Sequence, residues 1–186
     1  MELFLNCELD NMARIGRSKK KSRRASKTLL MFGEGLCEGI FLKHLKGLYS
    51  YNTNVAIAIR NGRGGNARSI VIDAHRSGAY DRKIVVLDND KPEPEMKSAR
   101  VEAAAKGIEL IENTPCLECL LLSIVEGKPG DKGSAWCKRE FESKYLPQKK
   151  RRELSEYPKV FPKGLLDSRR SQIAELNRLI EIMEGK

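Results

Sequence analysis

Two aspartates, Asp88 and Asp90, follow the apolar run Val85-Val86-Leu87 and are separated by a single residue. Side chains alternate between the two faces of a strand, so residues two apart point the same way. Carboxylates held side by side repel each other unless a positive charge lies between them. A hard divalent cation with oxygen ligands meets that need. The pair therefore predicts a metal site at a strand end, although Asp-Asn-Asp is also typical of a turn.

The elements around these residues must bring any further ligands to the same place. Short apolar runs and helical spacing alternate along the chain, which predicts an α/β fold with a mainly parallel sheet and helices on both faces. In such sheets the carboxyl ends of the strands form the site. Glu34 follows the first strand, so we expect it at the same edge as Asp88 and Asp90. The predicted strands are 28–32, 54–60, 83–87 and 108–111, and the predicted helices are 36–48, 67–77 and 97–106, with a turn at 91–94.

An apolar segment at 116–125 is predicted to be a helix, because Pro115 suits a helix start. Glu118 lies within it, and a buried glutamate needs a partner, so we expect Glu118 to face the site. Cys116 and Cys119 are interpreted as core residues, with half of a zinc site as the alternative. The odd count of five cysteines and the lack of a secretory signal predict a reducing, cytoplasmic location.

The chain of 186 residues carries a net charge of +10, from 35 Lys and Arg against 25 Asp and Glu. A charge of this size favours a polyanion such as nucleic acid as partner, with solubility alone as the alternative. No apolar run is long enough to cross a membrane. The predicted regions are a basic arm at 1–27, whose first eleven residues we interpret as an upstream extension, a catalytic domain at 28–126, and a basic helical region at 127–186.

Two motifs resemble those of a known family. A glutamate after the first strand and an Asp-x-Asp after a later one resemble the Toprim pattern, and the closer resemblance is to RloB-like proteins. Their Glu-Gly-x-x-Glu matches Glu34 to Glu38, and their Asn-Pro-Cys-x-Glu resembles Asn113 to Glu118. Here Thr114 is inserted, and Cys119 stands where tryptophan is common. The resemblance covers about residues 27–125.

The resemblance implies a Toprim nuclease that hydrolyses phosphodiester bonds of RNA or DNA with Mg²⁺, or alternatively Mn²⁺. It also implies an effector of prokaryotic antiphage defence, regulated by an ATPase or a sensor protein. The alternative is a non-catalytic nucleic-acid-binding or assembly subunit. The implied catalytic residues are Glu34, Asp88, Asp90 and Lys91. Of these, Lys91 would neutralise the scissile phosphate. The expected metal ligands are Glu34, Glu38, Asp88, Asp90 and Glu118.

Basic residues on the predicted surface would hold the nucleic-acid backbone. Three of them lie within the glycine-rich segment 60–68, and four form a run in the C-terminal region. A plain turn and a solvated face are the alternatives for these two segments. The predicted contacts are Arg60, Arg63, Arg68, Lys149, Lys150, Arg151 and Arg152.

Overall fold

A computed structural model of the chain describes residues 27–186. Its centre is a four-stranded, all-parallel sheet with the order β2-β1-β3-β4. The strands are β1 (Lys27–Gly33), β2 (Val55–Asn61), β3 (Arg82–Asp88) and β4 (Glu109–Asn113). The predicted α/β class and parallel sheet are confirmed. Of the predicted arm at 1–27, Lys27 begins β1, and the rest, including the proposed extension at 1–11, lies outside the described residues.

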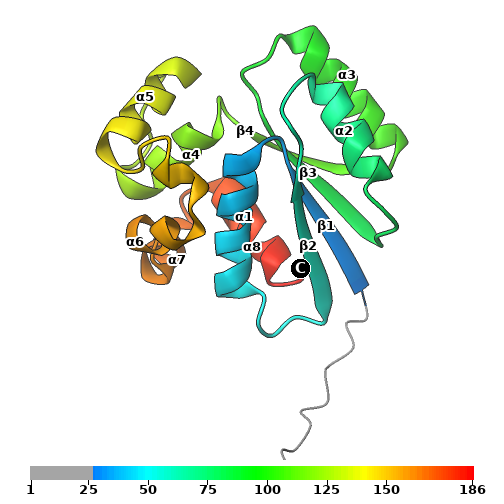
Figure 1. Ribbon diagram of the computed structural model, residues 1–186, viewed down its shortest axis with the longest axis horizontal. Coiled ribbons are helices and arrows are strands. Elements are labelled where there is room, and N and C mark those ends of the chain that lie inside the picture. The colour runs from blue at the N-terminus through cyan, green and yellow to red at the C-terminus, as the bar shows by residue number, and fades with distance from the viewer. Residues whose placement is uncertain (1–26) are drawn as a thin grey trace, which may run out of the picture.

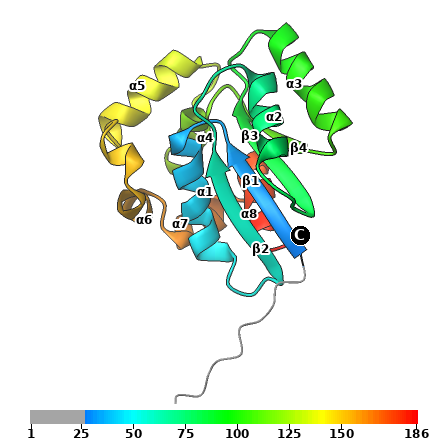
Figure 2. The same ribbon diagram turned by 45° about the vertical axis from the view of Figure 1, so that its right-hand side comes forward.

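Alternating side chains divide the sheet into two apolar faces, each covered by helices (Figures 1 and 2). Leu30 and Val85 pack on one face with α2 (Ala67–Arg76) and α3 (Glu93–Ala105). Met31 and Val86 point to the opposite face, against α1 (Leu36–Tyr49) and α4 (Leu117–Val125). Helices therefore lie on both faces of the sheet, as the alternation of elements predicted.

Helix α3 begins earlier than the sequence pattern predicted. The residues 91–94 were expected to form a turn, but Glu93 and Pro94 already belong to the first helical turn after Pro92. Proline is tolerated there because the first N–H groups of a helix have no intrahelical acceptor. The two prolines therefore mark a helix start.

The C-terminal region is helical, as predicted, and packs against the α1 and α4 side of the sheet (Figure 1). Aromatic rings of Phe141, Tyr157 and Phe161 join Phe41 of α1 in one buried cluster. His44 of α1 is buried, and its Nε2 lies 2.8 Å from the carbonyl oxygen of Phe161. The elements are α5 (Ser134–Lys144), η1 (Lys150–Arg152), η2 (Leu154–Glu156), α6 (Tyr157–Val160), α7 (Lys163–Arg169) and α8 (Ala174–Met183).

Helix α8 closes the fold on the same side. Its apolar residues recur at helical spacing, and Leu176, Leu179, Ile180 and Met183 are all buried. None of the helices within residues 27–186 combines the length and apolar character needed to span a membrane. The division at residue 126 stays a prediction, because both regions contribute side chains to the same apolar cluster.

Candidate metal centre

The strand order places two neighbouring strand ends where a site is expected. From β1 the chain crosses to β2 on one side, and later returns to β3 on the other. The helix after β1 and the helix after β3 therefore cover opposite faces, and in sheets of this kind ligands bind at the carboxyl ends of these strands. Glu34 follows β1 and Asp88 ends β3. The backbone N–H of Glu34 donates to the carbonyl of Val86 at 3.0 Å, which fixes the two ends together.

Asp88 is buried at the end of β3, in the middle of this group of acids. Its Oδ1 accepts hydrogen bonds from the backbone N–H of Leu117 at 2.9 Å and from Nδ2 of Asn113 at 3.3 Å. Burial, followed by the negative charges of Glu38 and Glu118, nevertheless raises the pKa of Asp88 to about 7. A carboxylate in this position lacks compensating positive charge. Asp88 is the last residue of β3, so the alternative of a turn is wrong for Asp88.

Glu34 and Glu38 lie on either side of the turn that leads into α1. Oε1 of Glu34 pairs with Nζ of Lys91 at 2.7 Å, and its Oε2 accepts from the N–H of Asp88 at 3.3 Å. Glu38 is buried, and its Oε2 accepts from the N–H of Gly35 at 2.8 Å, which caps α1. Burial is the main cause that raises the pKa of Glu38. Glu38 is therefore not a solvent-exposed charge on the helix surface.

Glu118 enters the centre from the first turn of α4 and is buried, as expected. Its Oε1 pairs with the guanidinium of Arg151, which also pairs with Glu142. Arg151 thus reaches inward from η1 and is itself buried, whereas the other three residues of its basic run are exposed. The structure therefore places Arg151 among the acids, on the inner side of the predicted nucleic-acid surface.

Asp90 lies farther out than Asp88. Because β3 ends at Asp88, the alternation of a strand does not extend to Asp90, which pairs instead with Nζ of Lys138 on α5 at 3.1 Å. The exposed fraction of the Asp90 side chain is 26 %. For Lys91, burial lowers the pKa, but the hydrogen bond to Glu34 and the charges of Glu34 and Asp90 outweigh that effect and raise it. Both lysines therefore keep their positive charges beside the acids.

Cys116 and Asn113 complete the lining of the centre, a role that the sequence pattern did not indicate for either residue. Ligand atoms of Asp88, Cys116 and Glu118 all lie within 4.8 Å of one another. Burial is the main cause that raises the pKa of the Cys116 thiol to about 11. These residues come together because β4 ends at Asn113 and α4 starts after Cys116, beside the end of β3.

The cysteines after Cys116 differ from the expectation in one respect. Cys119 and Cys137 are buried, as the core interpretation requires, but they form a disulfide that joins α4 to α5. Reduced thiols had been expected. Cys37 and Cys116 are free thiols within residues 27–186. A spacing of 18 residues between the bonded cysteines carries no motif, so the pairing was not visible in the sequence.

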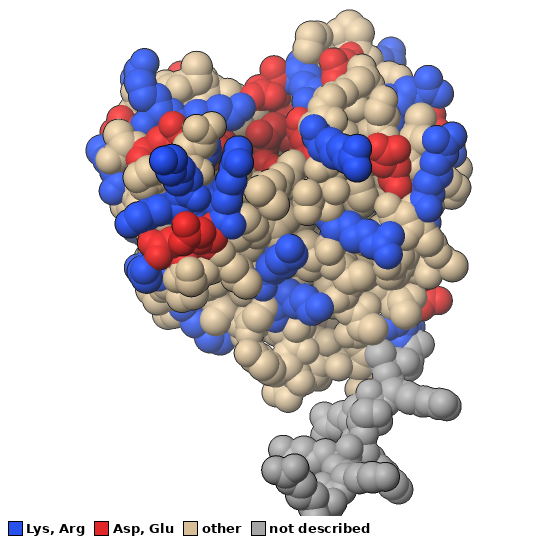
Figure 3. Space-filling view, viewed as in Figure 1, with Lys and Arg blue, Asp and Glu red and all other residues tan. Residues whose placement is uncertain are grey.

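The space-filling view shows how charge surrounds the centre. Acidic side chains gather in a hollow at the upper edge of the molecule, with basic side chains on both flanks (Figure 3). Arg60 and Arg63 line a cavity of about 600 Å³ formed around the loop after β2. Arg60 donates to the carbonyl of Ser77, and Arg68 pairs with Glu102 at 2.9 Å. The glycine loop is fixed to the site, because Gly64 N–H donates to the carbonyl of Glu34 at 3.2 Å.

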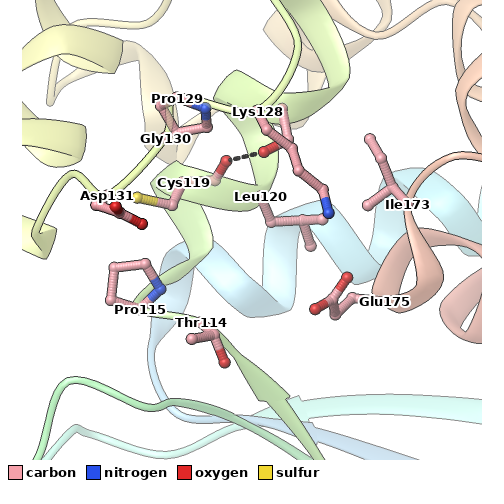
Figure 4. A pocket seen from close by; sticks show the side chains of 11 residues that line it. Thr114, Pro115, Cys119, Leu120, Lys128, Pro129, Gly130, Asp131, Ile173 and Glu175 are labelled. Atoms are coloured by element: carbon pink, nitrogen blue, oxygen red, sulfur yellow. Dashed lines mark hydrogen bonds between the residues drawn. The ribbon is translucent and has the colours of Figure 1, made fainter.

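A second cavity, of about 280 Å³, lies beside Cys119 and Leu120 of α4 (Figure 4). Its charged lining consists of Lys128, Asp131 and Glu175. One cation beside two carboxylates gives no surplus of positive charge to attract a phosphate. This cavity therefore adds nothing to a phosphate-binding surface.

Comparisons with protein-family models, with curated proteins and with solved structures gave no match for this chain.

Proposed function

We propose that this protein is a metal-dependent nuclease that hydrolyses phosphodiester bonds of RNA or DNA. The observation that carries the proposal is the convergence of Glu34, Glu38, Asp88 and Glu118 on one sheet edge. Burial and two negative neighbours raise the pKa of Asp88. A bound divalent cation would offset both effects by stabilising the ionised carboxylate. Oxygen ligands of this kind suit Mg²⁺, with Mn²⁺ as the alternative.

The residues of the chain have separable roles in this proposal. Asp88 and Glu118 would hold a metal in the buried part of the centre, and Glu34 and Asp90 would bind at its open side. A bound divalent ion would activate water and stabilise the charge of the leaving oxygen. Lys91 is held by Glu34 at 2.7 Å, in a position to neutralise a phosphate that enters the hollow. Glu34 is a further candidate for the proton transfer.

The charge distribution supports nucleic acid as the substrate class. Of the net charge of +10, residues 27–186 carry +6, from 28 Lys and Arg against 22 Asp and Glu. Their centre is acidic, and basic side chains lie on both flanks of the hollow (Figure 3). Lys149, Lys150 and Arg152 are exposed, as are Arg60 and Arg63 near the opposite flank. Phosphates held on these flanks would bring the backbone across the acids. The role as an antiphage effector under an ATPase or sensor rests on the sequence resemblance.

The test replaces Asp88 with asparagine. Asp88→Asn keeps the oxygen that accepts from Leu117 and Asn113 but removes the charge that a metal needs. We expect at least about a hundredfold loss of cleavage of RNA and DNA substrates in Mg²⁺ or Mn²⁺, corresponding to about 2.7 kcal/mol of barrier. Sequencing the cut ends in expressing cells would identify the substrate.

Asp81→Asn is the matched control. Asp81 lies at the opposite end of the sheet, where it accepts from the N–H and hydroxyl of Thr28 at 2.7 and 2.8 Å, and asparagine can accept there too. This variant is expected to cleave like the parent. Unchanged cleavage and unchanged cellular toxicity in Asp88→Asn, with metal present, would refute the nuclease proposal.

A second candidate function is a non-catalytic nucleic-acid-binding or assembly subunit. The observation that favours it is the pairing of three acids with protein cations: Glu34 with Lys91, Asp90 with Lys138, and Glu118 with Arg151. Such pairs stabilise acids without any metal. Under this alternative, nucleic-acid binding persists and the parent protein shows no cleavage with any divalent ion.

A further inference from the structure

The buried part of the centre contains a sulfur ligand besides its carboxylates. Asp88, Cys116 and Glu118 are each buried, and their ligand atoms lie mutually within 4.8 Å. They come from three adjoining positions: the end of β3, the residue before α4, and the first turn of α4. Backbone elements rather than flexible loops therefore hold all three, which is a favourable basis for ligand geometry.

Four buried polar side-chain atoms in residues 27–186 have no hydrogen-bond partner, and two of them are acceptor oxygens of Glu118 and Asn113. Oε2 of Glu118 and Oδ1 of Asn113 are buried without a hydrogen bond, in residues whose exposed fractions are 6 % and 0 %. Oε1 of Glu118 is taken by Arg151, so Oε2 is the oxygen that remains for a ligand. The amide of Asn113 lies against Asp88, because its Nδ2 donates to Oδ1. Burying such oxygens unpaired is costly.

We propose that Asp88, Cys116 and Glu118 bind a borderline divalent ion of the zinc class. Mg²⁺ is a hard ion that prefers oxygen, whereas a thiolate selects zinc and similar transition metals. The thiol of Cys116 loses its proton to solvent as the metal–sulfur bond forms. Three protein ligands leave a coordination position for water or substrate, as in catalytic zinc sites.

The charges around the group favour a cation. Asp88, Glu118 and a Cys116 thiolate carry three negative charges, and a divalent ion would offset two of them. Arg151 pairs with Glu118 and also with Glu142, so it offsets the remaining charge only in part. A bound divalent ion would therefore reduce the cost of burying these side chains.

The inference rests on the same centre as the proposed nuclease and names the class of its inner ion. Glu34 and Asp90, at the open side, offer only oxygen and remain suitable for Mg²⁺. Binding of the inner ion can be measured without any nucleic acid, so the two proposals can fail separately.

The test uses Co²⁺ as a spectroscopic probe for the zinc-class ion. The full chain, with its disulfide intact and no thiol reductant present, is titrated with Co²⁺. Coordination by a thiolate gives a sulfur-to-cobalt charge-transfer absorption, which oxygen ligands cannot produce. We expect this band in the parent protein. Cys116→Ser should abolish the band and weaken Co²⁺ binding by at least about tenfold.

Cys37→Ser is the matched control. Cys37 is the other free thiol among residues 27–186. The charges of Glu38, Glu118 and Arg151 affect its pKa, so it lies in the same electrostatic surroundings as the centre. The band should persist in this variant, and also in a Cys119→Ser/Cys137→Ser double variant. Circular dichroism of each variant shows whether it is folded, and Glu118→Gln provides a second test through an oxygen ligand, with weaker Co²⁺ binding expected.

Three outcomes would overturn the inference: Co²⁺ binding without the band, a band that survives in Cys116→Ser, or displacement of Co²⁺ by about a hundredfold excess of Mg²⁺. If the parent shows the band and cleaves no nucleic acid, the zinc-class site stands and the nuclease proposal fails. If Asp88→Asn loses cleavage and the parent shows no band, the nuclease proposal stands and the thiolate ligand is refuted.

Discussion

At the scale of single residues, Asp88 has the least favourable electrostatic surroundings in the centre. It is buried between Glu38 and Glu118, and only neutral N–H groups donate to it. A carboxyl whose pKa is raised on folding binds its proton more tightly in the native state. In the absence of metal, the native protein therefore loses stability as Asp88 ionises.

We predict that Asp88→Asn stabilises the chelated protein at about pH 8. Asp88 has a pKa near 3.8 when unfolded and about 7 when folded, so the native state loses stability between these values as pH rises. Removing the charge should raise the free energy of unfolding by roughly 2–4 kcal/mol above pH 7 and leave it unchanged below about pH 4. Urea unfolding in EDTA at both pH values measures this. Equal stability of the two proteins at high pH would contradict it.

At the scale of elements, a close approach between β1 and α1 sets the position of Glu38. A Cβ atom on Gly33 would lie 2.7 Å from Cβ of Glu38 and 3.0 Å from the backbone nitrogen of Gly39. Only glycine lets the start of α1 approach the end of β1 so closely. The glycine before Glu34 thus determines how near the two glutamates come to Asp88.

We predict that Gly33→Ala destabilises the fold by roughly 1–3 kcal/mol and lowers metal affinity, because α1 must move away from the strand. Gly47→Ala in the same helix is the control. An added Cβ at Gly47 meets no atom within 4 Å, so alanine there should stabilise the helix by about 0.5–1 kcal/mol. Thermal unfolding and metal titration of both variants provide the measurements. A Gly33→Ala protein with parental stability and affinity would argue against this packing.

At the scale of the whole molecule, the acidic centre is largely buried, whereas many of the basic side chains are on the surface. Acidic side chains gather in the hollow (Figure 3), and Glu38, Asp88 and Glu118 are buried, while three of the four residues in the run from Lys149 to Arg152 are exposed. Counterions released from phosphates make binding by such exposed cations depend on salt. The inward-facing Arg151 belongs to the acidic centre and should contribute little to this dependence.

We predict that replacing Lys149, Lys150 and Arg152 with glutamine lowers the slope of log affinity against log salt by about 2–3. The control neutralises three exposed cations elsewhere: Arg76, Lys97 and Lys163. Both variants lose the same net charge, so a difference between them locates the binding surface. Fluorescence anisotropy with a labelled oligonucleotide measures the slopes. Equal slopes in the two variants would show that only the overall charge matters.

Local patterns predicted the sheet and the edge where the acids meet. Alternating apolar runs predicted the strands, and parallel strand ends predicted that Glu34 and Asp88 lie together. The apolar surroundings of Glu118 correctly predicted that it is buried. These inferences succeeded because they depend on periodicity and on the direction of parallel strands, which neighbouring residues encode.

Contacts between distant segments could not be predicted in this way. Lys138 pairs with Asp90 across 48 residues, and Arg151 reaches Glu118 across 33. Each depends on how the C-terminal helices pack on α1 and α4, and no local pattern encodes that arrangement. Cys116 had a signal, since it lies in the segment between Asn113 and Glu118, but its apolar surroundings favoured a purely structural role.

The disulfide between α4 and α5 also determines what happens when the chain is cut. It encloses the loop 126–133, in which Lys132 is exposed and precedes Gly133. Trypsin cleavage after Lys132 should therefore produce two polypeptides that migrate as one band in a denaturing gel and separate only after a reductant is added. Separation without reductant would show that Cys119 and Cys137 are unpaired. In the bonded protein, a backbone break at this loop leaves Glu118 and Lys138 on different polypeptides that remain covalently linked.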